Sequence, residues 1–187
     1  GAVLVLLRQP TTRLTNGDWL AAGGLIGLSA LFKQTGLLTL AAFGLWAWLT
    51  ADGWKVGLRR WLWLLAGCAL PLAVTAALFA AQDALPDLWR DTVWINATAY
   101  PRQSLSVLLR GNLTNLRAFP VLVIGLLAGL LFHPPSFRRQ GQRQAETLLW
   151  LTLASGLLPL LHRYYGHYLL QPLPAAAILA GTGLATA

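Results

Sequence analysis

Long apolar runs separated by short polar connectors dominate this chain. The runs cover residues 19–32, 37–49, 61–81, 118–132, 147–161 and 169–187, and the opening "GAVLVLL" resembles the end of an earlier run. A helix needs about 20 mostly apolar residues to cross a bilayer. The pattern therefore predicts an all-α, polytopic transmembrane bundle of about six spans plus a remnant, within one domain over residues 1–187.

The first two runs are too short to cross a membrane comfortably by themselves. As helices they would rise about 20 Å each, against a hydrocarbon core of about 30 Å. Between them stands "KQTG", where Gly36 can break a helix. We predict two separate helices that meet at Lys33 to Gly36. One tilted helix over 19–49 is the alternative, and it would bury Lys33 near the middle of the membrane.

Basic connectors alternate along the chain. They are "RQPTTR" at residues 8–13, the connector 50–60 and the connector 133–146. Positively charged loops stay on the cytoplasmic side of a membrane. This rule places the Lys33 turn, the 82–117 loop and the "HRYYGHY" turn on the opposite, outer face.

Aromatic residues support this reading of the connectors. Five tryptophans surround the 50–60 connector, where amphipathic rings favour the headgroup layer: Trp46, Trp48, Trp54, Trp61 and Trp63. In the outer loop, apolar residues recur at helical spacing at Leu85, Leu88, Trp89 and Val93. They predict a short helix that lies on the bilayer or packs on its own protein.

Composition agrees with a membrane protein and disfavours a soluble one. Hydrophobic residues make up 56% of the chain and charged residues 11%, against about 25% charged in soluble domains. The net charge of +8 is explained by basic cytoplasmic connectors, so no nucleic-acid partner is expected. The single cysteine, Cys68, excludes an internal disulfide. Because the chain opens inside an apolar run and has no Met, we expect a fragment of a multi-pass protein of the plasma (inner) membrane.

Hydrogen-bonding residues crowd the entrance to the last run. "HRYYGHY" holds Arg163, His167 and three tyrosines, and Lys33 adds a cation on the same predicted face. Acidic residues are scarce, and an ionised group away from water needs a partner. A lipid phosphate would satisfy these donors, since guanidinium binds phosphate through two hydrogen bonds. The alternative is that Arg163 extends to the headgroups and the tyrosines form an aromatic belt.

Two stretches resemble a known family. "RYYGHYLLQPLPAAAILAG" is similar to the R-x-Y-x-H-Y core and proline-bearing span of membrane glycosyltransferases of the protein mannosyltransferase and aminoarabinose transferase type. "GLIGLSALFKQTGLLTLAAFGLWAWL" resembles a glycine-rich short helix of that family, which ends in a lysine and glycine turn before another short helix. The spans between the two stretches agree with the family in hydropathy only.

The resemblance implies the C-terminal part of a GT-C fold and transfer of a sugar from a polyprenyl-phosphate carrier to a glycan, lipid or protein acceptor outside the cytoplasm. It implies that the carrier phosphate is bound or bordered by Lys33, Arg163, Tyr165, His167 and Tyr168. The family's general base lies in its first outer loop, which would precede Gly1, so the catalytic residue stays unknown. Some members use a divalent metal, and this sequence has no ligand cluster that indicates one.

Two other functions fit the same cations. A transporter or flippase of a lipid-linked anion would hold its cationic pocket nearer the middle of the membrane and would show paired repeats, which this sequence lacks. A lipid-linked glycan ligase or polymerase would also bind a carrier phosphate from the outer face.

Overall fold

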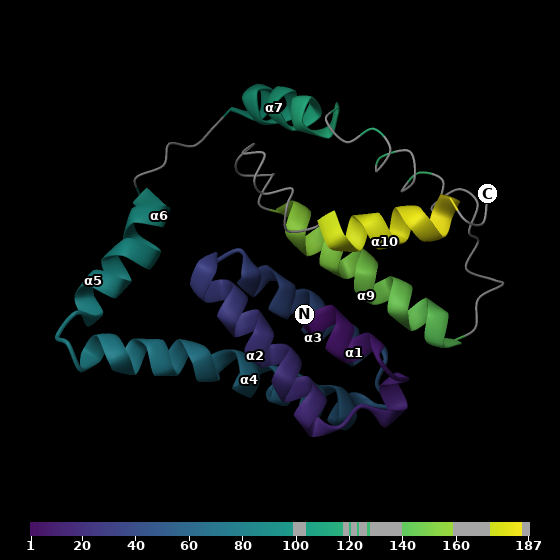
Figure 1. Ribbon diagram of the computed structural model, residues 1–187, viewed down its shortest axis with the longest axis horizontal. Helices are drawn as coiled ribbons and strands as arrows, with labels where there is room; N and C mark the ends of the chain where they lie inside the picture. Colours follow the sequence, from purple (N-terminus) through teal and green to yellow (C-terminus); the bar gives the residue numbers. More distant parts are fainter. Residues whose placement is uncertain are drawn as a thin grey trace. The chain divides into compact units, whose positions relative to one another are not determined.

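The computed structural model describes residues 1–98, 104–117, 140–158 and 173–184, with single positions at 120, 123 and 127. Every regular element in these residues is helical, which confirms the predicted all-α class (Figure 1). The elements are α1 (Ala2–Leu7), the 3-10 turn η1 (Thr11–Arg13), α2 (Asn16–Phe32), α3 (Gly36–Leu49), α4 (Trp54–Ala80), α5 (Leu85–Trp89), the π-helical turn η2 (Arg90–Trp94), α6 (Ile95–Thr98), α7 (Leu105–Arg117), α9 (Gln140–Leu157) and α10 (Leu173–Leu184).

The chain divides into two compact units. Unit 1 contains residues 1–40 and 51–102, and unit 2 contains residues 41–50 and 103–187. Helix α3 contributes its first turn to unit 1 and its remaining residues to unit 2. The two units are therefore described separately.

The predicted break between two short helices is confirmed. Helix α2 ends at Phe32 and α3 begins at Gly36. Lys33 has extended backbone angles, with φ −155° and ψ 116°, so it stops the helix. Gly36 then lies close to the preceding helix, because a Cβ atom at this position would meet the backbone nitrogen of Ala30 at 3.0 Å.

Helices α2 and α4 pack against each other and form the centre of unit 1 (Figure 1). Their contact is built from glycines that let the two backbones approach closely. A Cβ atom on Gly67 would meet the backbone nitrogen of Gly24 at 2.9 Å and the carbonyl oxygen of Leu20 closer still. A Cβ atom on Gly27 would meet Pro71 Cγ at 2.6 Å. Gly23 and Gly27 stand four residues apart on α2 and both face the backbone of α4. Small residues at this spacing are typical of helix contacts inside membranes, where close backbone packing replaces the hydrophobic effect.

Helices α2 and α4 run parallel to each other, as the order of their contacts shows. Arg60 lies near the start of α4 and contacts Trp19 near the start of α2, whereas Gly27 lies beside Cys68 and Pro71 further along α4. At the two helix starts, Arg60 also donates to the Thr11 carbonyl of the basic 8–13 connector. The turn after α2 and the segment after α4 lie toward the other end of unit 1.

Among the described residues, α4 is the one helix that is long and apolar enough to cross a membrane. It has 27 residues, which rise about 40 Å as a helix. Only 17% of its most apolar window is buried, so α4 does not resemble the core helix of a soluble domain. Its exposed apolar side chains repeat every fourth residue along one face, at Leu58, Leu62, Leu70, Val74 and Leu78.

Several predicted boundaries were wrong. The connector predicted over 50–60 ends at Gly53, because α4 begins at Trp54 and includes Lys55, Arg59 and Arg60. Helix α9 likewise begins inside the predicted connector 133–146. A bundle of six spans is not evident in the described residues: α2 has 17 residues and α3 has 14. The run 118–132, apart from positions 120, 123 and 127, and the whole "HRYYGHY" turn lie outside them.

The short helix predicted within the 82–117 loop is confirmed, and most of the described residues of this loop are helical. Helix α5, the turn η2 and α6 follow each other from Leu85 to Thr98, and α7 follows from Leu105. Proline at the start of α5 favours a helix there, since its fixed φ suits the first turn. Trp89, Val93 and Trp94 are exposed.

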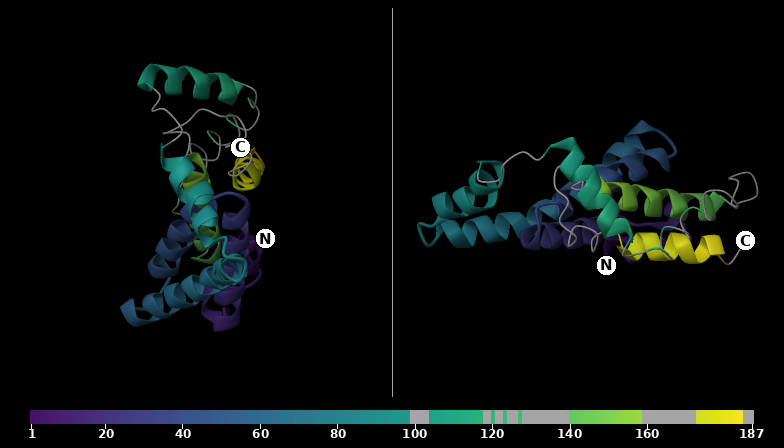
Figure 2. Two further views of the ribbon diagram at one scale, coloured as in Figure 1. Left: turned by 90° about the vertical axis from the view of Figure 1, so that its left-hand side faces the viewer. Right: turned by 90° about the horizontal axis from the view of Figure 1, so that it is seen from above.

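In unit 2, α9 and α10 contact each other and lie side by side (Figure 2). Their buried side chains are leucines of α9 and two alanines and a leucine of α10: Leu148, Leu149, Leu153, Ala175, Ala176 and Leu179. Trp46 of α3 is fully buried, and its Nε1–H donates to the Gln144 carbonyl at 2.7 Å. Trp46 is thus covered by its own protein, whereas Trp48 and Trp54 are exposed.

We expect Trp46→Phe to lower the free energy of unfolding by about 1 to 2 kcal/mol, because it removes one hydrogen bond and leaves a carbonyl less well satisfied. Thermal unfolding in detergent measures this change. Trp48→Phe is the matched control on the same helix, since Trp48 is 46% exposed. Equal effects of the two substitutions would contradict a structural role for the Trp46 hydrogen bond.

Candidate functional site

Lys33 is the one predicted carrier-binding residue within the described part of the chain, and it stands in the turn between α2 and α3. Its backbone N–H donates to the Ser29 carbonyl at 2.9 Å, and its own carbonyl accepts from the Gly36 N–H at 2.8 Å. These two bonds close the helix and start the next one. The backbone of the turn is thus fixed on both sides of the lysine.

The Lys33 side chain is half-buried. Burial lowers the pKa of Lys33, because a charged ammonium loses hydration there. A cation that is partly removed from water binds an anion more strongly than a fully hydrated one. The position therefore suits recognition of a negatively charged group.

The neighbouring Gln34 joins this turn to the segment after α4. Its side-chain amide donates to the Thr92 carbonyl in η2, and the Thr92 hydroxyl donates to the Leu88 carbonyl at 2.5 Å. The Lys33 turn and the 85–94 segment therefore lie at the same end of unit 1. In that segment Arg90 binds Asp87 at 3.0 Å and Asp91 at 2.9 Å, with all three side chains exposed.

The other predicted carrier-binding residues are Arg163, Tyr165, His167 and Tyr168. All four lie outside the described residues, so their convergence with Lys33 stays a prediction. The apolar run that follows them is described in part as α10.

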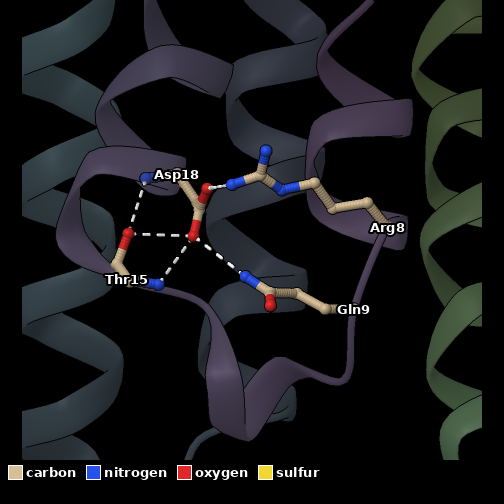
Figure 3. Close-up of polar contacts among 4 residues, drawn as sticks. All are labelled: Arg8, Gln9, Thr15 and Asp18. Carbon is tan, nitrogen blue, oxygen red and sulfur yellow. Dashed lines mark hydrogen bonds and ion pairs between the residues drawn. The ribbon is translucent and has the colours of Figure 1, made fainter.

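A second polar cluster, which the sequence analysis missed, lies at the start of α2 (Figure 3). Asp18 is 4% exposed, and its carboxylate accepts from three residues. The Thr15 backbone N–H donates at 2.8 Å, the Thr15 hydroxyl at 2.9 Å and the Gln9 amide at 3.2 Å. Arg8 forms an ion pair with the same carboxylate. The Asp18 N–H donates back to the Thr15 hydroxyl at 3.3 Å, which completes a capping box.

The cluster holds Asp18 in its ionised form. The hydrogen bond from the Thr15 backbone is the main reason why the pKa of Asp18 lies below its ordinary value. The Thr15 hydroxyl and the charge of Arg8 lower this pKa further, against the opposing effect of burial. The sequence "TNGD" before an apolar run matches the capping-box pattern, and this signal could have found the cluster.

Arg60 extends this cluster from α4. It is 7% exposed, its guanidinium lies 5.4 Å from the centre of the Trp19 ring, and it donates to the Thr11 carbonyl at 3.4 Å. A cation over an indole ring is stabilised by the negative face of the ring. The cluster therefore connects the 8–13 connector, α2 and α4 and stabilises this end of unit 1. Asp18 already binds Arg8, and Arg60 already contacts Trp19 and Thr11, which favours a structural role over a catalytic one.

No group of three or more His, Cys, Asp or Glu that could hold a metal occurs in the described part of the chain. No residue there is assigned as a metal ligand.

The chain matches no protein-family model, no curated protein and no solved structure. The resemblance to membrane glycosyltransferases therefore depends on the two quoted stretches alone.

Proposed function

We propose that this chain belongs to a polytopic membrane glycosyltransferase, which moves a sugar from a polyprenyl-phosphate carrier to an acceptor at the outer face of the plasma membrane. The proposal includes several membrane spans besides α4, formed by the remaining apolar runs. It assigns binding of the carrier phosphate to Lys33 together with Arg163, Tyr165, His167 and Tyr168.

The observation that carries the proposal is the Lys33 turn. A half-buried lysine stands in a break between two short apolar helices. The break lies at the end of unit 1 that α5 and η2 also occupy. A lipid-linked phosphate lies at the headgroup level while its polyprenyl chain stays in the hydrocarbon. A cation between two short apolar helices suits both parts of such a ligand.

The contribution of such cations to sugar transfer is electrostatic. As the bond between the sugar and the carrier phosphate breaks, negative charge grows on the phosphate that leaves. Fixed cations stabilise this charge more in the transition state than in the ground state. Arg163 can add two parallel hydrogen bonds where Lys33 adds a single charge.

We expect Lys33→Gln to weaken binding of a polyprenyl phosphate about tenfold, because one charge-assisted contact is lost. Binding is measured with the protein in nanodiscs, with the polyprenyl phosphate itself as the probe. Lys55→Gln is the matched control, since the only other lysine is exposed near the start of α4, away from the Lys33 turn. Equal affinities for wild type and Lys33→Gln would contradict the assignment of Lys33.

A second measurement separates transfer from transport. Transfer releases free polyprenyl phosphate from a sugar-loaded carrier when an acceptor is supplied. A flippase moves the intact carrier between leaflets of a vesicle without releasing it. Movement of intact carrier with no release would overturn the glycosyltransferase and leave a phosphate-binding transporter.

A further inference from the structure

Helix α7 carries a surface that the proposed reaction does not use. Three leucines repeat every fourth residue along it, at Leu105, Leu109 and Leu113. They are 71%, 55% and 57% exposed, whereas Leu108 on the adjoining line is 8% exposed. The helix is therefore covered at Leu108 and presents a stripe of exposed leucines beside it.

The charged residues of α7 are both arginines, and they lie next to the leucine stripe. Arg110 and Arg117 stand three residues before and four residues after Leu113, so both are its neighbours on the helix surface. Both are exposed, and residues 105–117 contain no Asp or Glu. A leucine stripe flanked by arginines is the pattern of a helix at a membrane interface.

We propose that α7 lies flat on an anionic phospholipid surface, with its leucine stripe in the acyl boundary and Arg110 and Arg117 at the lipid phosphates. The helix has 13 residues and rises about 20 Å, which is too short to cross a hydrocarbon core of about 30 Å. Residues 81–104 connect it to α4, the helix long enough to cross a membrane. This tether keeps α7 near a bilayer surface and raises its effective concentration there.

Lipid fits this surface better than a second protein. Three leucines on one short helix offer a small apolar area, and stable protein interfaces bury about 800 Å² on each partner. The paired arginines match lipid phosphates in charge. The inference depends on the membrane location in the proposed function and not on sugar transfer, so each can fail without the other.

The test compares two faces of α7 in the whole chain reconstituted into vesicles. A fluorescent label is attached to a cysteine at Leu109 or at Thr114, after Cys68→Ala removes the native thiol. Residue 114 lies about 140° around the helix from residue 109 and is exposed. With spin-labelled lipid as the quencher, we expect at least about twofold stronger quenching at 109 than at 114.

Vesicles of phosphatidylcholine alone and of phosphatidylcholine with phosphatidylglycerol test the role of charge. We expect stronger quenching at 109 in the anionic vesicles, and Arg110→Gln and Arg117→Gln should each weaken partitioning about fivefold there. Protection of 109 from both lipid quencher and aqueous iodide would overturn the proposal in favour of a protein contact. Free access of iodide to 109 would overturn it in favour of a hydrated helix.

Discussion

Gly23→Ala is expected to lower the free energy of unfolding by about 3 kcal/mol, although alanine favours a helix more than glycine does. A Cβ atom on Gly23 would meet the carbonyl carbon of Leu64 at 2.9 Å and the Cys68 nitrogen at 3.0 Å. Both atoms belong to the backbone of α4, so no side-chain rotation can remove the overlap. The two helices must separate, and unfolding in mixed detergent micelles measures the loss.

Gly24→Ala is the matched control at the next position. A Cβ atom there would lie 3.8 Å from the Gly67 carbonyl oxygen, which is an ordinary contact. We expect this variant to equal wild type or to gain up to about 1 kcal/mol from the helix preference of alanine. Equal destabilisation by both variants, or by neither, would contradict the close α2 and α4 contact.

The helix break at Lys33 could be predicted because several sequence signals agree there. The apolar runs on either side are short, Gly36 follows, and a lysine inside a longer helix would be buried. The structure adds the reason for glycine at this position, which is the close approach to Ala30. The end of a helix can be predicted from the sequence where, as here, glycine and the cost of burying a charge favour the same position.

The start of α4 could not be predicted in the same way. Hydropathy marks where apolar residues begin, but the helix continues backwards through Lys55, Arg59 and Arg60 to Trp54. Gly53, with φ 114°, sets the boundary through its backbone freedom. Arg60 also shows that a charged residue beside an apolar run is not always solvated, because the Trp19 ring and the Thr11 carbonyl cover it.

Tertiary contacts decide the features that the sequence left open. Trp46 and Trp48 are two residues apart in the same apolar run, and hydropathy does not distinguish them. Trp46 is nevertheless buried and bonded to α9, whereas Trp48 is exposed. The glycines of α2 are explained by the structure, in which the backbone of α4 lies directly against them. For the candidate site, the sequence predicted Lys33 in a turn, whereas the partner of that turn, the Thr92 carbonyl that accepts from Gln34, lies 58 residues further along the chain.

A substitution in the capping cluster at Asp18 is expected to have the second large effect on stability. Asp18→Ala is expected to lower the free energy of unfolding by about 2 kcal/mol, because it removes the helix cap and leaves the donors of Thr15 and Gln9 without the buried carboxylate that accepts from them. Arg8→Gln should cost less than about 1 kcal/mol, since the Arg8 side chain is 61% exposed and solvent weakens its ion pair. Asp52→Ala, at an exposed acid of the connector before α4, should be nearly neutral.

The same cluster predicts how stability depends on pH. The pKa of Asp18 is lower in the folded chain than its ordinary value of 3.8, so the folded state favours the ionised carboxylate. Its contribution is complete above that value and is lost as the pH falls through the lower folded-state pKa. The difference in unfolding free energy between wild type and Asp18→Ala should therefore be constant from pH 5 to 7 and shrink below about pH 4. A difference that stays constant into strong acid would contradict an ionised Asp18, because protonation would then leave the hydrogen bonds to Thr15 and Gln9 unweakened.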